Sequence, residues 1–277
     1  MNTIVKQDTA FFLGHNGLGD NITNIGALNF LSQYYNTIYF LCKDIYYENL
    51  TKLFQTKIMN KNIILIQFNS KNEYYECKTI ITQAMNNIIS NSMQNSSIDI
   101  FISGRCHTSY LQSRITHPQL LQYKKNDNGY TIKWSHIHDF YYDIGLDLSI
   151  YYNYFNIDSC QKSKDYFEHI KNYNILFLHT KSSNKELNLK HIIDKFIDKE
   201  DTIIICANKN VYEKKLNHNN TKYELANNYV NILIAYYIDI IYNSIEIHVI
   251  DSCFSCIIHP LNVTNKLSAK IVTIHDR

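Results

Sequence analysis

The chain contains three polar segments, each placed after an apolar run, whose residue types could bind an anion or transfer a proton. Residues 14–20 combine glycines with a carboxylate, residues 179–185 combine a histidine with hydroxyls and lysines, and residues 251–255 combine a carboxylate with hydroxyls. Open parallel sheets bind ligands at the carboxyl ends of their strands. The free N–H groups and the dipole of a helix that begins there suit a phosphate or carboxylate group. We therefore expect all three segments to be ligand-binding loops.

The first segment is rich in glycine. Four of the seven glycines in the chain lie within residues 9–34. A chain with so little glycine places one where the backbone needs a positive φ or a close approach. Residues 9–34 therefore predict a strand, a specialised turn and a helix. Asp20 follows the turn, at the position of an N-cap or first-turn carboxylate.

The second and third segments each allow a structural explanation beside the functional one. Hydroxyls and lysines dominate the second segment, which either lines a ligand site or forms a solvated loop. Its candidate binding residues are His179, Thr180, Ser182, Ser183 and Lys185. In the third segment, Ser252 is predicted to cap a helix, and Asp251 faces a ligand at the edge of the sheet. A plain capping pair explains these two residues equally well.

Standard motifs for cofactors and metals are missing from the three segments. Residues 14–20 read GHNGLGD, which matches neither the G-x-G-x-x-G pattern of dinucleotide sites nor the Lys-Ser/Thr ending of a P-loop. Cys253 and Cys256 form a C-x-x-C, but no second ligand pair accompanies it. No Asp-x-Asp occurs to clamp a metal-bound nucleotide. We therefore expect no metal site and no cofactor.

The elements that position these segments alternate between strands and helices. Apolar runs predict strands at residues 37–42, 62–68, 98–103, 174–178, 202–206, 246–250 and 271–274. Helices are expected between them, among others at residues 187–197 and 229–242. This alternation predicts an α/β protein with two Rossmann-like domains, residues 1–158 and 159–277. The aromatic segment 137–155 is predicted to pack either in the core or at the junction between the domains.

Composition narrows the class of protein. The net charge of +2 over 277 residues gives no electrostatic support for binding to nucleic acid. Seven cysteines without framework spacing, and the lack of a signal peptide or of an apolar run long enough to span a membrane, predict a soluble cytoplasmic protein. The abundance of Asn, Ile, Lys and Tyr is typical of an AT-rich genome, such as that of a giant DNA virus or a protozoan, and carries little functional information.

Two sets of motifs, at opposite ends of the chain, resemble the GT-B glycosyltransferases, in particular the ADP-heptose:lipopolysaccharide heptosyltransferase family. The motifs are a strand, Gly-Asp and a helix at one end, and a strand, Asp-Ser-small-x-Ser and a helix at the other. The resemblance implies two domains facing a cleft, and inverting, metal-independent transfer from a nucleotide-diphosphate sugar to a hydroxyl of a glycan or other acceptor. It implies that Asp20 is the catalytic base and that Gly17, Gly19 and Asn21 form the acceptor-side loop. The implied donor-binding residues are His179, Thr180, Ser182, Ser183, Lys185, Asp251, Ser252, Cys253 and Ser255.

Three residues depart from the family pattern. Gly26 stands where the family has Pro after Gly-Asp, Cys253 replaces a Gly that lets backbone approach phosphate, and Cys256 replaces a His. Cys253, Cys256 and the short second half keep open a non-catalytic binding or scaffold protein that retained the GT-B fold. A nucleotide-sugar epimerase, which uses the same fold, is a third possibility. It would need several acidic groups and a histidine around the sugar, and the sequence does not place them.

Overall fold

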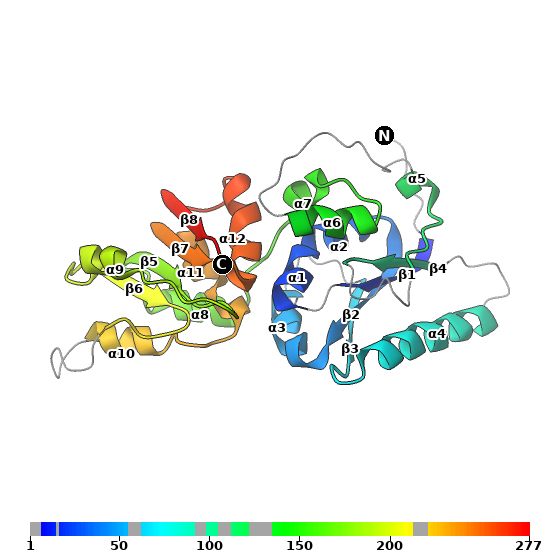
Figure 1. Ribbon diagram of the computed structural model, residues 1–277, viewed down its shortest axis with the longest axis horizontal. Helices are drawn as coiled ribbons and strands as arrows, with labels where there is room; N and C mark the ends of the chain where they lie inside the picture. The colour runs from blue at the N-terminus through cyan, green and yellow to red at the C-terminus, as the bar shows by residue number, and fades with distance from the viewer. Residues whose placement is uncertain are drawn as a thin grey trace. The chain divides into compact units, whose positions relative to one another are not determined.

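The chain forms two compact units, Met1–Asn156 and Ile157–Arg277 (Figure 1). The computed structural model describes residues 7–14, 17–54, 62–91, 98–104, 112–121, 135–212 and 221–277. Each unit contains a four-stranded sheet in which all neighbouring strands run parallel. The predicted α/β class with two parallel sheets is therefore confirmed. The division falls two residues before the position expected from the sequence.

The first sheet has the strand order β3-β2-β1-β4. Its strands are β1 (Gln7–Leu13), β2 (Tyr35–Lys43), β3 (Ile63–Phe68) and β4 (Ile98–Ile102). In the register, Leu13 is opposite both Leu41 and Ile102, so the carboxyl ends of three strands meet at one edge. Residues 10–13 of the central strand are fully buried. A strand covered on both faces needs an unbroken apolar run, which is why the sequence shows no alternation here.

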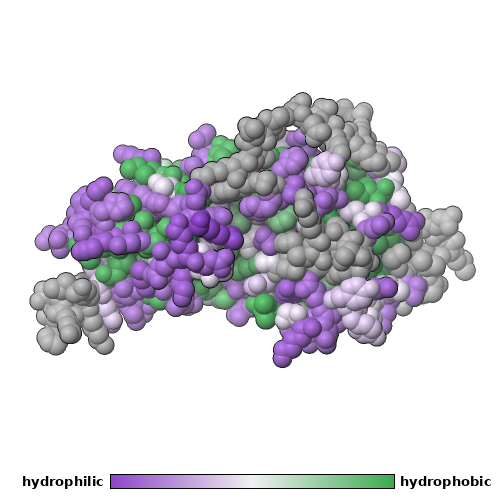
Figure 2. All heavy atoms as spheres, viewed as in Figure 1, coloured by the Kyte–Doolittle hydropathy of each residue, from purple (hydrophilic) through white to green (hydrophobic). Residues whose placement is uncertain are grey.

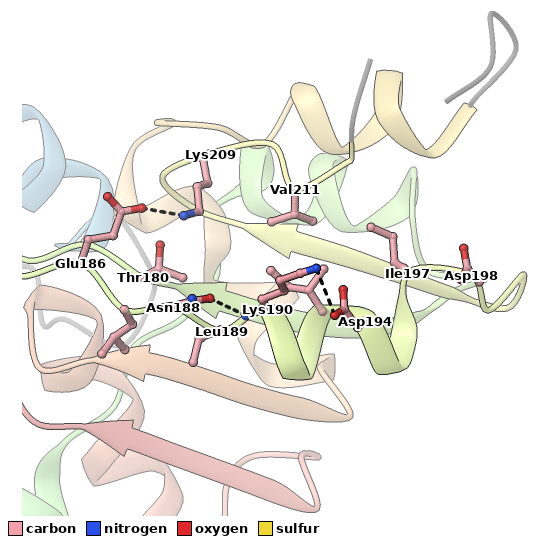
Figure 3. Close-up of a pocket in the computed structure, with 12 residues that line it drawn as sticks. Thr180, Glu186, Asn188, Leu189, Lys190, Asp194, Ile197, Asp198, Lys209 and Val211 are labelled. Atoms are coloured by element: carbon pink, nitrogen blue, oxygen red, sulfur yellow. Dashed lines mark hydrogen bonds and ion pairs between the residues drawn. The ribbon is translucent and has the colours of Figure 1, made fainter. Parts of the chain in front are cut away.

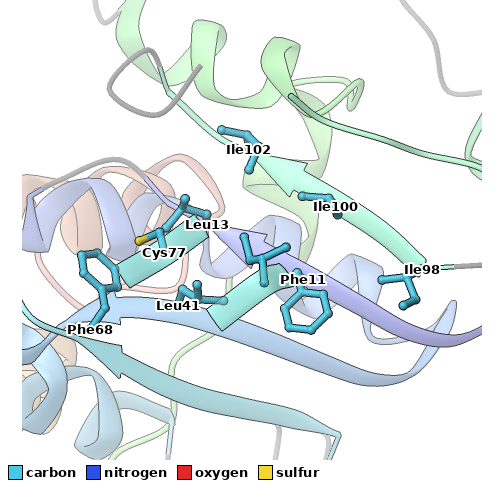
Figure 4. Packing of buried hydrophobic residues seen from close by; sticks show 9 residues of the cluster. Phe11, Leu13, Leu41, Phe68, Cys77, Ile98, Ile100 and Ile102 are labelled. Carbon is cyan, nitrogen blue, oxygen red and sulfur yellow. The ribbon is translucent and has the colours of Figure 1, made fainter. Parts of the chain in front are cut away.

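Helices cover both faces of the first sheet. They are α1 (Leu18–Thr23), α2 (Ile25–Leu31), α3 (Asp44–Phe54), α4 (Glu73–Asn91), α5 (Pro118–Leu121), α6 (Ser135–Asp143) and α7 (Ser149–Tyr154). On one face, Cys77 and Ile81 of α4 join a cluster of strand residues that includes Phe11, Leu13 and Ile100 (Figure 4). On the other face, Phe40 of β2 packs against Phe54 of α3, with ring centroids 5.6 Å apart. Burial of this apolar surface is the main favourable term in folding of the unit.

The aromatic segment 137–155 forms part of the core of the first unit. Most of it lies in α6 and α7, and Tyr141 and Tyr151 are fully buried. The hydroxyl of Tyr141 accepts the N–H of Ala27 at 3.0 Å and lies 3.0 Å from the carbonyl of Thr23, which it serves as donor. These bonds tie the segment to α1 and α2. The structure therefore places the segment according to the core alternative.

A buried carboxylate, Asp99, holds the N-terminal end of β4. Asp99 is fully buried and accepts the Tyr35 hydroxyl at 2.6 Å, both the N–H and the hydroxyl of Thr116 at 2.7 Å, and the His117 N–H at 3.1 Å. Burial and this carboxylate raise the pKa of Tyr35. Because four donors satisfy its oxygens, Asp99 has a structural role.

The second sheet has the strand order β6-β5-β7-β8. Its strands are β5 (Asn174–His179), β6 (Thr202–Cys206), β7 (Glu246–Ile250) and β8 (Ile271–His275). The helices are α8 (Gln161–Glu168), α9 (Lys190–Phe196), α10 (Thr221–Asn227), the 3₁₀ helix η1 (Ile234–Tyr237), α11 (Ile238–Asn243) and α12 (Cys253–Val263). No helix among the described residues is sufficiently long and apolar for a membrane span.

Two predicted helices of the second unit were wrong in extent. The helix expected at 229–242 is only η1 and α11, because Asn231 takes a left-handed conformation with φ of 56° and Tyr237 donates its hydroxyl to the Tyr229 carbonyl at 2.5 Å. The helix expected at 187–197 begins three residues later. The N–H of Leu187 instead bonds the Thr180 carbonyl at 2.8 Å, and Lys181 and Glu186 form an antiparallel bridge.

Candidate functional site

Asp20 lies in the first turn of α1, at the carboxyl edge of the first sheet, as the sequence predicted. Gly17 is the N-cap, and its N–H donates to Oδ2 of Asp20 at 2.9 Å, so the Asp20 carboxylate satisfies the N–H of the N-cap residue. A Cβ at position 17 would come within 2.8 Å of the same oxygen. Gly17 is therefore needed for the carboxylate to approach the backbone, and φ of −90° shows that a left-handed conformation is not the reason. The neighbouring residues 15 and 16 lie outside the described part of the chain.

Buried amides hold this turn against the sheet. Asn21, which is 3% exposed, donates its Nδ2 to the Gly17 carbonyl at 2.7 Å. Asn24 donates to the Asp20 carbonyl at 2.9 Å and accepts the hydroxyl of Ser103, which follows β4, at 2.8 Å. Gly19 is the second residue of α1, and its carbonyl accepts the Thr23 hydroxyl at 3.0 Å. Sequence reasoning missed Asn24 and Ser103, because their pairing spans 79 positions of the chain.

In the second unit, the motif after β7 caps α12. The Ser252 hydroxyl accepts the N–H of Phe254 at 3.3 Å, and the Ser255 hydroxyl accepts the N–H of Ser252 at 3.0 Å. Ser255 also donates to Oδ1 of Asp251 at 2.9 Å. The capping role predicted for Ser252 is confirmed. The first turn of α12 still directs its remaining N–H groups toward the carboxyl edge of the sheet, where they suit an anion.

His179 and Ser252 come together from the ends of the adjacent strands β5 and β7. Nδ1 of His179 lies 3.1 Å from the Ser252 hydroxyl, and its ring lies 4.6 Å from that of Phe254. Burial lowers the pKa of His179 to about 4. The imidazole is therefore neutral at pH 7, and Nδ1 can accept the Ser252 proton. His179 of the second predicted segment and Ser252 of the third thus lie in one polar site.

Two cations reach the same edge through the end of the chain. Nε of Arg277 donates to the Asp251 carbonyl at 2.7 Å and lies 3.2 Å from Oδ2 of its carboxylate. Nζ of Lys185 donates to the Asp276 carbonyl at 3.2 Å. The Arg277 side chain is 51% exposed, so its remaining N–H groups are open to solvent or a ligand. Sequence reasoning assigned Lys185 to the site and missed Arg277.

Thr180 faces a different neighbour, the loop after β6. It is 1% exposed, and its N–H donates to Oδ1 of Asn208 at 2.8 Å, while Asn208 returns its Nδ2 to the Thr180 hydroxyl at 3.1 Å. Ser182 closes a tight turn with Lys185, whose carbonyl accepts the Ser182 N–H at 2.8 Å. Ser183 is exposed in that turn. The structure therefore does not gather all the predicted donor-binding residues around one point.

Cys253 and Cys256 are free thiols in the first turns of α12. Burial raises the pKa of Cys253 to about 11, so this thiol is protonated at neutral pH. Cys256 is 7% exposed and donates to the Ser252 carbonyl at 3.5 Å. Across the ranges that the structure describes, no group of three or more His, Cys, Asp or Glu side chains is arranged to hold a metal ion.

A groove of about 800 Å³ runs along α9, beside the ends of β5 and β6 (Figure 3). Its sides carry charges, including an ion pair of 2.6 Å between Lys209 and Glu186, and its apolar lining includes Leu189 and Ile193. Of the predicted donor-binding residues, Thr180 lines this groove. The remaining lining residues are Leu187, Asn188, Lys190, Asp194, Ile197, Asp198 and Val211. On the face shown in Figure 2, hydrophilic residues cover most of the second unit and hydrophobic residues form small areas between them.

Comparison with known proteins places this geometry in a known fold. No protein-family model matches the chain, and no curated protein matches it significantly. Among solved structures, a glycosyl transferase of family 9 from Veillonella parvula is similar with a TM-score of 0.55 and 10% identity, over 100% of this chain and 87% of that one. The chain has a GT-B fold. ADP-heptose lipopolysaccharide heptosyltransferase II from E. coli is similar with a TM-score of 0.50 and 8% identity, over 96% of this chain and 89% of that one.

The GT-B fold accounts for the presence of two parallel sheets, each with a polar carboxyl edge. At identities of 10% and 8%, the comparison establishes the fold and leaves the chemistry to the residues at those edges. One edge presents a carboxylate at Asp20, and the other presents a capped helix with two nearby cations.

Proposed function

We propose that the protein transfers a sugar from a nucleotide-diphosphate sugar to a hydroxyl of a glycan or another acceptor. The observation that carries this proposal is the meeting of the β5 and β7 segments at one edge of the second sheet, within a GT-B fold. There His179 contacts Ser252, Arg277 pairs with Asp251 just before α12, and Lys185 donates to the carbonyl of Asp276. This edge is the donor side, and the Asp20 edge of the first sheet is the acceptor side.

The donor side stabilises the leaving group. When the bond between the sugar and the diphosphate breaks, its electron pair stays on a phosphate oxygen, which gains negative charge. Lys185, Arg277 and the N-terminal end of α12 place positive charge and N–H donors where such an anion can be stabilised. These groups give a reason for transfer without a metal ion.

The acceptor side activates the nucleophile. Oδ2 of Asp20 is engaged by the Gly17 N–H, so Oδ1 is the oxygen that can take a proton from an acceptor hydroxyl. The hydroxyl oxygen attacks the anomeric carbon, the bond to the diphosphate breaks, and the proton goes to Asp20. A single displacement of this kind inverts the anomeric centre.

Nucleotide-sugar binding tests the proposal directly. The intact chain would be heated with UDP-, GDP-, ADP- and CMP-sugars, and one of them should raise the midpoint of unfolding. At a ligand concentration tenfold above Kd, the gain is about 1.4 kcal/mol, or a shift on the order of 3 °C. Transfer with that donor would then be followed by NMR of the anomeric proton, with and without a chelator. No shift with any donor would contradict the proposal.

The non-catalytic alternative has one observation in its favour. Cys253 occupies the first position of α12, where its side chain adds bulk next to the N–H groups that would meet a phosphate. A scaffold protein would give no thermal shift with any of the four donors. Its variant Cys253→Gly would also give none, whereas a donor site restricted by the thiol would gain affinity in that variant.

A further inference from the structure

Two histidines lie against each other at the strands β7 and β8. His248 is 5% exposed, and its Nε2 lies 2.7 Å from Oε1 of Glu246. The ring of His275 lies 5.7 Å from the ring of His248, with 30° between the planes. In the register, His275 is opposite Ile250, two residues beyond His248 and therefore on the same face of the sheet.

One nitrogen on each ring is buried without a hydrogen bond among the described residues, Nδ1 of His248 and Nε2 of His275. A neutral imidazole can leave one nitrogen bare at modest cost. An imidazolium carries a proton on both nitrogens, so charged His275 would bury an N–H that has no acceptor. His275 is therefore suited to the neutral state.

The charges around His275 oppose its protonation. Burial lowers the pKa of His275, as do the neighbouring His248 of β7, His191 of α9 and Lys185. Asp276 acts in the other direction, and Glu246 is bound to the far side of His248. The helix α12 packs against β8 and contributes none of the charges that act on His275.

His275 also fastens the end of the chain to the donor side. Its carbonyl accepts the N–H of Asp251 at 2.8 Å. The next two residues take part in the contacts of both candidate cations. The Asp276 carbonyl accepts a hydrogen bond from Lys185, and Arg277, the second cation, pairs with Asp251. Residues 275–277 therefore link the segments after β5 and β7, and Figure 1 shows the C-terminus beside α12.

We propose that His248 and His275 form an acid-sensitive latch, in which protonation of His275 separates the end of β8 from β7 and frees Asp276 and Arg277. Opening removes the contact of Arg277 with Asp251 and the contact of Lys185 with Asp276. The structural opening does not depend on the protein being a transferase. Its consequence, weaker donor binding in acid, rests on the proposed function.

Hydrogen exchange of the intact chain tests the latch. Protection of residues 269–277, corrected for intrinsic rates, would be measured at about pH 7.5 and about pH 5, which brackets ordinary histidine titration. We expect wild-type protection to fall about tenfold or more at the lower pH, and that of residues 174–179 in β5 to stay constant. In His275→Asn the difference between the two pH values should disappear. His169→Asn, at an exposed position on the second unit, should behave as wild type.

Equal protection at both pH values in the wild type, or an unchanged loss of protection in His275→Asn, would overturn the proposal. If His275→Asn fails to fold, His248→Asn serves instead. This variant removes a charge that disfavours protonated His275 in the closed state, so protonation drives opening less strongly. Opening should then need a lower pH or vanish. An opening profile identical to wild type would overturn the latch. A failed nucleotide panel would refute the proposed function and leave the exchange result standing.

Discussion

Asp20 has two roles that substitution can separate. Its carboxylate accepts the Gly17 N–H at 2.9 Å as part of the cap of α1, and in the proposed reaction it also takes the proton of the acceptor. Asp20→Asn keeps a side-chain oxygen for the cap and abolishes the base. Asp20→Ala removes both.

The structure sets the size of each effect. Loss of a capping side chain costs about 0.5–2 kcal/mol of stability, so Asp20→Ala should lose roughly 1 kcal/mol. Asp20→Asn keeps the hydrogen bond and loses only the charge at the helix N-terminus, about 0.3–1 kcal/mol. A missing general base lowers turnover by about 10²–10⁴. Asp20→Asn should therefore lose far more activity than stability.

The assay combines urea denaturation with turnover and donor affinity, using the donor that the thermal panel identifies. Asp44→Asn is the matched control, because Asp44 also starts a helix at the same edge and its Oδ1 accepts the Ile45 N–H at 2.9 Å. This control should lose a similar small amount of stability and keep its turnover. Donor affinity should be unchanged in both variants.

Two outcomes would refute this reasoning. Turnover in Asp20→Asn within about tenfold of wild type would exclude Asp20 as the general base. A stability loss in Asp20→Asn as large as that in Asp20→Ala would show that the hydrogen bond to Gly17 is not what holds the turn.

Three further predictions concern packing, pH and charge. Gly26→Ala would place a Cβ 2.8 Å from the Tyr151 carbonyl, so the overpacking cost of about 1–3 kcal/mol should exceed the gain of about 1 kcal/mol in helix propensity. The variant should therefore unfold at a lower urea concentration, and a midpoint equal to wild type would contradict this. The folded pKa of His179, about 4, lies below that of the unfolded chain, so stability is full above about pH 6.5 and falls as pH drops toward 4. His179→Gln should reduce this slope and leave a residual slope from His259 and His275, whose pKa values are also lowered. An unchanged slope would be the contrary result. Lys185→Ala should weaken donor binding about tenfold or more in titration calorimetry, with a stability change under about 0.5 kcal/mol. Substitution of its exposed neighbour, Lys181→Ala, should alter neither quantity. Equal affinities in the two variants would remove Lys185 from the donor site.

The sequence by itself determined the strands and the main cap. Buried parallel strands need continuous apolar runs, so residues such as those of β1 and β6 are visible as uninterrupted hydrophobic stretches. Ser252 was predictable as a cap because its partners, Phe254 and Ser255, are local. The glycines of residues 9–34 signalled close approach, which the structure confirms at Gly17 and at Gly26 in α2, and none of the described residues 14–26 takes a positive φ.

Only the tertiary structure decided which polar groups meet. Asn24 with Ser103, Thr180 with Asn208 and Asp251 with Arg277 are pairs from separate elements of the chain, and nothing in the local spacing couples their positions. The broken helix after Tyr229 likewise follows from a hydroxyl of Tyr237 that bonds back onto the chain. Local sequence fixes hydrophobic period and caps, because these depend on neighbours in the chain. The donor-side edge depends on the sheet order, which brings the ends of β5, β7 and β8 together.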